Sequence, residues 1–165
     1  MRSICRWFAV IATWSIVTSA QADIISVNPG ASLQAAINSA LDGDVIEVTA
    51  GEFNENINFL GKAITVVGVG PTTVLRGTGA GPVVTFASGE SDDSILDSVT
   101  VTGGQAQRGG GIFISAASPT IIRTVITKNR ASQQGSGVHI ENSSTARLYN
   151  NLLIYNFTSG GDPHS

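Results

Sequence analysis

Short runs of alternating apolar and polar residues, separated by glycine-containing turns, make up nearly all of the chain after Asp44. Such runs are typical of β-strands. No segment of helical periodicity separates them, so a sheet built from strand–helix–strand units is not expected. The predicted strands are residues 45–48, 56–59, 63–67, 73–75, 83–86, 95–101, 112–115, 120–122, 125–127, 138–141, 146–149 and 152–155.

One helix is predicted, over residues 32–41. Its apolar residues recur at helical spacing from Leu33 to Ala40, and they would lie on one face. Ser32 is a suitable N-cap, and Gly43 follows the last periodic residue. We expect this short helix to cover open strand edges at one end of a sheet.

The stretch from residue 109 to residue 156 repeats itself. The segment GGGIFI at 109–114 returns as GSGVHI at 135–140, 26 residues on, and 125–129 returns at 152–156, 27 residues on. A short repeat of strand and turn residues is typical of a solenoid. An antiparallel sandwich would also show alternation but has no reason to repeat at this spacing. The repeat therefore favours a parallel coil with three short strands in each turn.

In such a coil, equivalent residues of successive turns stack in columns about 4.8 Å apart. Asparagines in a turn column would pass amide hydrogen bonds from coil to coil. The predicted columns are Val84–Ile112–Val138, Phe86–Ile114–Ile140, Val99–Val125–Leu152, Val101–Thr127–Ile154 and, in the turn, Gly103–Asn129–Asn156.

Three N-terminal segments, PGASLQAAI at 29–37, GDVIEV at 43–48 and GEFNENI at 51–57, carry a resemblance to a known family. They resemble the cap and first coil of the right-handed parallel β-helix, or pectin-lyase-like, superfamily. Residues 118–129 resemble a right-handed β-helix repeat. The resemblance implies an all-β, right-handed, single-stranded parallel β-helix of about four coils with a short N-terminal capping helix. It implies a cap over 23–44 and coils over 45–165.

The end of the chain carries no visible C-terminal cap. Two explanations stay open: a fragment of a longer solenoid, incomplete at its C-terminus, or a short solenoid closed by oligomerisation. Because an uncovered last coil exposes backbone donors and acceptors, we expect end-to-end self-association there.

Residues 1–22 have the pattern of a secretion signal. Arg2 and Arg6 precede an apolar run at 7–17, and Ala20-Gln21-Ala22 offers a cleavage site before Asp23. We therefore expect a secreted, periplasmic or cell-surface protein without a transmembrane segment after cleavage. Cys5 would be removed, and seven basic residues would face twelve acidic ones, a net charge of −5. This balance argues against a nucleic-acid partner.

The resemblance also implies chemistries that this fold carries. A calcium-dependent, pectate-type polysaccharide lyase would hold calcium with acidic residues and remove a proton with a basic one. Calcium is thus the one cofactor considered, although no spacing is diagnostic. The pectinesterase Gln-Asp motif is not found. The candidate calcium ligands are Glu90, Asp92 and Asp93, with Asp97, and the candidate bases are Arg108, Lys128 and Arg130, with Arg123.

An outward line of side chains offers a different site. Thr85, Phe113 and His139 alternate with the inward columns, and Glu141 shares their face. The functional interpretation is a sugar platform, in which Phe113 stacks on a ring while His139 and Glu141 bind hydroxyls. The plain interpretation is a solvated strand face. The leading functional prediction is an exported, non-enzymatic surface module that binds a polysaccharide or cell-surface glycan. A lyase, or the remnant of one, is the alternative, and a structural spacer is a third.

Overall fold

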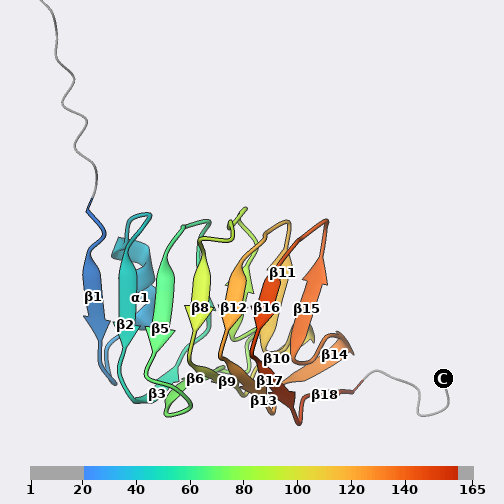
Figure 1. Cartoon of the computed structure of the whole chain (residues 1–165). Coiled ribbons are helices and arrows are strands. Elements are labelled where there is room, and N and C mark those ends of the chain that lie inside the picture. Colours follow the sequence, from blue (N-terminus) through green and yellow to red (C-terminus); the bar gives the residue numbers. More distant parts are fainter. Residues whose placement is uncertain (1–20, 160–165) are drawn as a thin grey trace, which may run out of the picture.

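The structure, a computed structural model, describes residues 21–159. The chain winds around one axis, and the strands of successive coils pair side by side into sheets that run along it (Figure 1). Each ladder between neighbouring strands in these sheets is parallel. The predicted fold class, an all-β right-handed parallel β-helix with one short helix, is confirmed. Most of the predicted signal peptide lies outside the described residues, as does 160–165.

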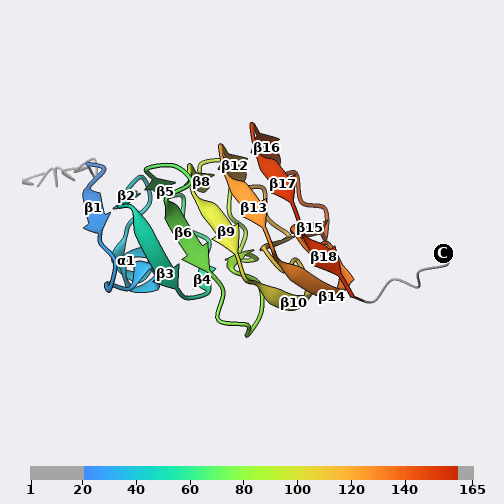
Figure 2. The same cartoon turned by 90° about the horizontal axis from the view of Figure 1, so that it is seen from below.

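Three sheets surround the core. Sheet A lies in front in Figure 1, and sheet B lies in front in Figure 2. Sheet A contains β1 (Ile24–Val27), β2 (Val45–Val48), β5 (Thr65–Gly68), β8 (Ile95–Asp97), β12 (Thr120–Ile122) and β16 (Arg147–Tyr149). Sheet B contains β3 (Gly51–Asn54), β6 (Thr73–Arg76), β9 (Thr100–Thr102), β13 (Val125–Thr127) and β17 (Leu152–Ile154). Sheet C contains β4 (Ile57–Asn58), β7 (Val84–Phe86), β11 (Ile112–Ser115) and β15 (Val138–Glu141).

A fourth sheet, sheet D, was not predicted. It lies between the strands of sheets B and C along the chain, in the later coils only (Figure 2). Its members are polar, so hydrophobic alternation does not mark them. They are β10 (Gln105–Arg108), β14 (Arg130–Gln134) and β18 (Phe157–Thr158).

The predicted register is confirmed in sheet C and wrong by one residue in sheet B. Ile112 pairs with both Val84 and Val138, and Ile114 with both Phe86 and Ile140. In sheet B, Val101 pairs with Ile126 rather than Thr127, and both Val101 and Ile126 are fully buried. Successive strands of this sheet are not equally spaced, because Val125 pairs with Thr100 on one side and Leu152 on the other. A constant repeat length therefore misplaces Val99 and Val101.

The turn column shifts in the same way. Asn129 is buried and accepts a hydrogen bond from the amide of Gly104, at 2.9 Å, so Gly104 rather than Gly103 belongs to this column. The Asn129 side chain donates to Asn156 Oδ1 at 3.0 Å and to the Val101 carbonyl at 3.1 Å. The predicted asparagine contact from coil to coil is confirmed for this pair.

Single residues in the left-handed region turn the chain from one sheet to the next. Ser98, Arg123 and Asn150 have φ values of 53°, 49° and 53°, and each directly follows a strand of sheet A. Lys128 and Tyr155, both at 55°, directly follow strands of sheet B. These corners direct alternate side chains of every strand into one interior.

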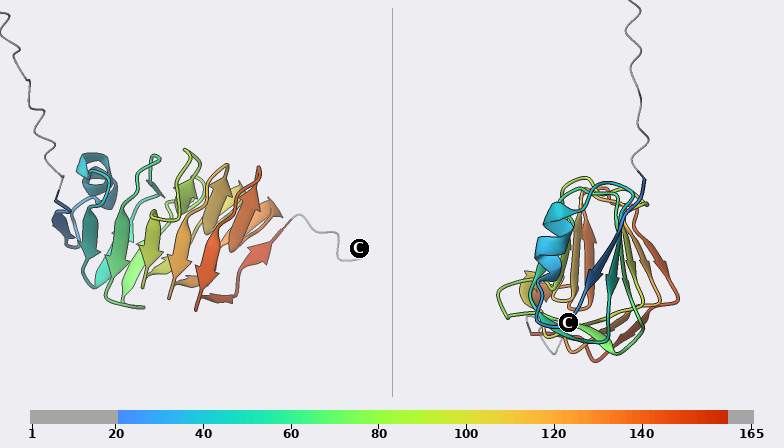
Figure 3. Two further views of the ribbon diagram at one scale, coloured as in Figure 1. Left: turned by 45° about the horizontal axis from the view of Figure 1, so that its top comes forward. Right: turned by 90° about the vertical axis from the view of Figure 1, so that its left-hand side faces the viewer.

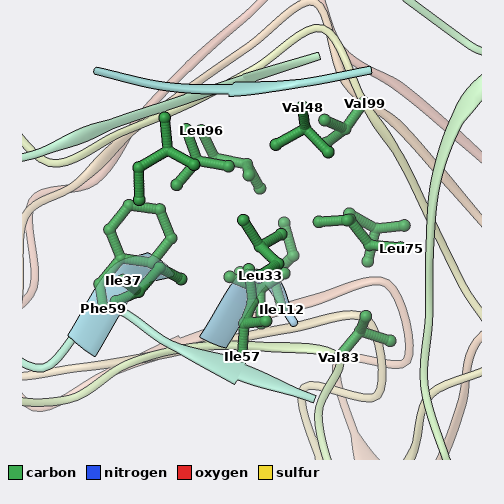
Figure 4. Packing of buried hydrophobic residues seen from close by; sticks show 14 of the residues in the cluster. Leu33, Ile37, Val48, Ile57, Phe59, Leu75, Val83, Leu96, Val99 and Ile112 are labelled. Atoms are coloured by element: carbon green, nitrogen blue, oxygen red, sulfur yellow. The ribbon is translucent and has the colours of Figure 1, made fainter. Parts of the chain in front are cut away.

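The interior is apolar and closely packed (Figure 4). Side chains from all three sheets meet there, among them Leu96, Leu75 and Ile112. The rings of Phe59 and Phe86 lie 4.3 Å apart between centroids. The same column positions are fully buried from coil to coil through the middle of the molecule, with Val66, Leu96 and Ile121 at 0% exposure.

Helix α1 (Leu33–Ser39) covers the N-terminal end of the coil, on one side of it in the right-hand view of Figure 3. Ser32 caps it as predicted, accepting the Ala35 amide at 3.1 Å, but the helix ends at Ala40 rather than Leu41. Leu33 and Ile37 are fully buried beneath it. Among the described residues, no helix has the length and apolar character needed to cross a membrane.

Candidate functional site

The outer face of sheet C carries the predicted line of side chains. Phe113 lies beside Thr85 on one side and His139 on the other, because β7, β11 and β15 are paired in register. The Phe113 and His139 rings are stacked, 6.0 Å apart between centroids and 6° from parallel. Ile112 and Ile114 point into the core at 0% exposure, which leaves Phe113 on the outside. The structure therefore brings these three residues together.

Glu141 closes this line with a charged network. Its Oε2 atom lies 3.1 Å from Nε2 of His139 and accepts a hydrogen bond from Arg108 at 3.0 Å. The His139 hydrogen bond, and then the charge of Arg108, lowers the pKa of the Glu141 carboxyl. Glu141 is therefore held as an ionised carboxylate in a fixed direction, which suits a hydrogen-bond acceptor.

A groove runs between this face and sheet D. Its volume is about 1010 Å³. One wall is the loop 79–82 with strand β10, and another is the start of β14, while Phe113 and Glu141 come from sheet C. The groove is an open surface feature along the coil, which suits an extended ligand better than a small enclosed one.

The groove contains both charged and neutral polar groups. Arg108 and Arg130 line it from neighbouring strands of sheet D. Arg108 is paired with Glu141, whereas the Arg130 guanidinium lies over the Phe157 ring, 5.7 Å from its centroid. Neutral donors and acceptors are supplied by Gln105, Gln107, Ser132 and Ser159.

Two predicted site residues lie away from the groove. His139 does not line it, and its side chain is 13% exposed, because it lies against Phe113 and Glu141. It orients the two residues that do line the groove. Lys128, a candidate base, sits exposed at a left-handed corner outside the groove, unlike Arg108 and Arg130.

The candidate calcium ligands do not converge. Both carboxylate oxygens of buried Glu90 accept backbone amides, from Gly61 at 2.9 Å and Ser88 at 2.8 Å. Asp92 pairs with Arg147 at a smaller hollow away from the main groove, and Asp93 is exposed in the turn. Within residues 21–159, no three His, Cys, Asp or Glu side chains gather as metal ligands would.

The remaining charged candidates form a separate pair. Asp97 is 8% exposed and binds the guanidinium of Arg123 from the next coil, with Ser98 as a second acceptor. Arg123 occupies a left-handed corner, which aims its side chain back across the coil edge. The pair joins adjacent coils outside the groove.

Sequence reasoning missed the sheet D wall of this site. The segments QAQR at 105–108 and RASQQ at 130–134 lack an apolar stripe, so they do not register as strands. A positional signal was present nonetheless. Each segment lies between a strand of sheet B and a glycine that opens the next strand of sheet C.

Comparison with solved structures supports the fold. A crystal structure of a pectin methylesterase mutant in complex with a hexasaccharide matches with a TM-score of 0.56 and 12% sequence identity. The match covers 90% of this chain and 59% of that chain, so the present chain spans little more than half of that protein. At this identity the likeness concerns the fold alone. No curated protein matches the chain.

Comparison with protein families gives a sequence-level relationship. The family described as periplasmic copper-binding protein (NosD) matches residues 77–162. This stretch includes both main walls of the groove and most of the coils that form sheet D. Because the match spans more than half of the sequence, the chain belongs to the NosD family of parallel β-helix proteins.

Proposed function

We propose that this protein is an exported β-helix module that binds carbohydrate in the groove between sheets C and D. The single observation that carries the proposal is the pairing of Phe113 with Glu141 on one wall of the groove. An aromatic face and a fixed acceptor at neighbouring positions match a sugar, which has an apolar ring face and polar hydroxyls at its edge.

The surroundings of Phe113 support this role. The stacked His139 ring limits rotation of Phe113 from one side, so little side-chain entropy remains to be lost on binding. Glu141 is fixed by His139 and Arg108 and keeps a free acceptor direction toward the groove. The neutral side chains of Gln105 and Ser132 supply further hydroxyl partners.

The comparisons support the setting of this proposal. The NosD family is described as periplasmic, which agrees with the signal pattern at residues 1–22. The matching pectin methylesterase structure holds a hexasaccharide, which illustrates that a β-helix of this kind can present a saccharide-binding surface. Its sequence is only 12% identical, so no residue role is transferred.

Copper binding, named in the family description, does not fit the described residues. Copper sites use imidazole, thiolate or thioether ligands in sets of three or four. Residues 21–159 hold one histidine, His139, and neither cysteine nor methionine. The nearest charged partners of His139 are Glu141 and, through it, Arg108, whose positive charge opposes a bound cation. The proposal therefore takes no step through copper.

The test is binding of the purified protein to a panel of neutral and acidic oligosaccharides, followed by calorimetry on the best ligand. We expect Phe113→Ala to weaken binding at least about tenfold, or about 1.4 kcal/mol. Glu141→Gln should weaken it less, because the amide still accepts one hydrogen bond. Tyr149→Ala is the matched control, since Tyr149 is an exposed aromatic on sheet A, outside the groove.

Two results would contradict the proposal. If no oligosaccharide is retained, or if Phe113→Ala binds as the unchanged protein does, the groove is not a sugar site. Release of unsaturated uronides from the ligand, abolished by a chelator, would favour the lyase alternative instead. Arg108→Ala and Arg130→Ala would then separate the two candidate bases in the groove from Lys128.

A further inference from the structure

The last coil carries a large exposed apolar surface, which we call the C-terminal end surface. It comprises large apolar side chains of β15, β16, β17 and β18 and of the corner after β17. Their exposed fractions run from 37% for Leu148 to 79% for Tyr155. The surface consists of Ile140, Leu148, Tyr149, Leu152, Leu153, Ile154, Tyr155 and Phe157.

Part of this surface is the continuation of the core. Ile140, Leu148 and Leu153 pair with Ile114, Ile121 and Ile126 of the coil before. Those three isoleucines are at 0% exposure, whereas the residues stacked on them are at 43%, 37% and 47%. Inward-facing side chains that remain this exposed lack the neighbour that every earlier coil provides.

The charges at this end do not oppose contact with a like surface. Residues 148–159 contain no charged residue. Arg147 is already paired with Asp92 of an earlier coil, and Glu141 with Arg108 and His139. Natural edge strands are usually protected by lysine, proline or a bulge. Lysine, proline and glycine are absent from residues 138–159.

The opposite end of the molecule cannot supply the partner surface. Helix α1 lies over it, and the Gln34 side chain bonds both the N–H and the C=O of Asn58 in the edge strand β4, at 2.7 and 3.1 Å. Head-to-tail stacking of one copy on another is therefore blocked. An isologous contact, in which the same surface meets itself across a two-fold axis, is the arrangement that remains for two copies.

We infer that two copies of this chain associate through their C-terminal end surfaces, with their edge strands antiparallel across a two-fold axis. The area is sufficient. The eight exposed fractions amount to about four fully exposed large side chains, which is on the order of 800 Å² if each contributes about 200 Å². A standard interface buries about 800 Å² per partner. Sugar binding and self-association would use different surfaces.

The experiment is light scattering coupled to gel filtration on the purified protein, with concentrations up to about 100 µM. We expect a mass of two chains. Tyr155→Lys and Leu153→Lys should return it to one chain, because each places an unpaired ammonium in the contact. Leu41→Lys, at a 66% exposed residue of the N-terminal end, should leave two chains and is the matched control.

A crosslinking measurement gives an independent readout. In a chain with Cys5 replaced by serine, Tyr155→Cys should form a disulfide-linked pair on mild oxidation, whereas Leu41→Cys should not. Circular dichroism identifies variants that fold. Because Tyr155 is 79% exposed, Tyr155→Lys should fold even if Leu153→Lys does not.

Three outcomes would overturn the inference. One is a mass of one chain at every concentration tested. Another is a mass of two chains that persists in folded Tyr155→Lys. The third is crosslinking through Leu41→Cys, or assemblies larger than two chains, since either would indicate head-to-tail stacking.

Discussion

The two ends of the β-helix differ in how they terminate the stack of coils. At the N-terminal end, α1 buries Leu33 and Ile37 completely. At the C-terminal end, Leu153 occupies the same kind of inward position but is 47% exposed. A coil of a solenoid is stabilised mainly by its two neighbours, so an end needs a cover of a different kind. The comparison shows which side chains supply that cover at one end.

The N-terminal cover is held by side chains that arrive from the following coil. Glu55 accepts hydrogen bonds from Ser32 and from the Leu33 and Gln34 amides at the start of α1, where unpaired amides need acceptors. Lys62 donates to three carbonyls at the end of α1, from Ile37, Asn38 and Ala40, each at 2.7 Å. A seven-residue helix is too short to be stable alone, so these anchors and its buried face hold it.

The largest predicted effect compares one leucine from each end. Leu33→Ala should lower the free energy of unfolding by about 2–5 kcal/mol, because it leaves a cavity under α1. Leu153→Ala should cost less than about 1.5 kcal/mol in dilute protein, because half of that side chain already meets solvent. Urea titration monitored by circular dichroism measures both.

Equal losses for the two variants would contradict the comparison. They would mean that the C-terminal end is covered in solution as completely as the N-terminal end. Repeating the titration of Leu153→Ala at high protein concentration then separates a covering second copy from a covering segment of the same chain. Only a second copy makes the cost depend on concentration.

Most of the fold could be predicted from the sequence because the repeat and the alternation reinforce each other. In sheet C the alternation fixes which face is buried and the 26-residue spacing fixes the register, so Phe113 was correctly placed beside His139. In sheet B the spacing changes from 25 residues at Val125 to 27 at Leu152, and a constant repeat length misplaces one column. Nothing local in the sequence marks that change.

The site was only partly predictable, for a different reason. Glu141 and Phe113 lie on an alternating strand, so their shared face follows from the sequence. The sheet D wall does not, because β10 and β14 are polar and pair only with each other and β18. The role of Glu90 also depends on tertiary contacts, since its partner Gly61 is 29 residues away. A local acidic cluster could not distinguish a buried anchor from a calcium ligand.

A middle-sized effect should follow from removing the charge that anchors α1. Lys62→Met keeps the aliphatic stem but leaves three carbonyls at the end of the helix without their donor. We expect a loss of about 1–3 kcal/mol in the free energy of unfolding. Hydrogen exchange at the Asn58 amide should also accelerate, because α1 positions the Gln34 side chain that accepts its hydrogen bond.

Lys128→Met is the matched control for this substitution. Lys128 is exposed at a corner beyond β13, far along the coil from the helix, and its replacement should change stability by less than about 0.5 kcal/mol. If the two variants lose the same stability, the Lys62 contacts do not anchor the helix. The cover would then rest on the buried leucine and isoleucine alone.

The smallest effect concerns the order in which the two ends weaken on acidification. The Leu41 and Asp23 amides lower the pKa of the Asp44 carboxyl at the N-terminal end, and His139 followed by Arg108 lowers the pKa of the Glu141 carboxyl in the last coils. A carboxyl with a lowered folded pKa adds stability above its unfolded pKa and loses it as the pH falls through the folded value. The ordinary values are 4.5 for Glu141 and 3.8 for Asp44.

The contribution of Glu141 should therefore begin to fade at a higher pH than that of Asp44. Thermal melts of the unchanged protein, Glu141→Gln and Asp44→Asn between pH 7 and pH 3 give the difference in Tm for each pair. The gap for Glu141→Gln should be constant at neutral pH and narrow below about pH 4.5, and the gap for Asp44→Asn should narrow only below about pH 3.8. A gap that widens as the pH falls would mean that the carboxyl in question is destabilising when ionised. That result would contradict the hydrogen bonds assigned to it, and for Glu141 it would also remove the fixed acceptor on which the sugar site depends.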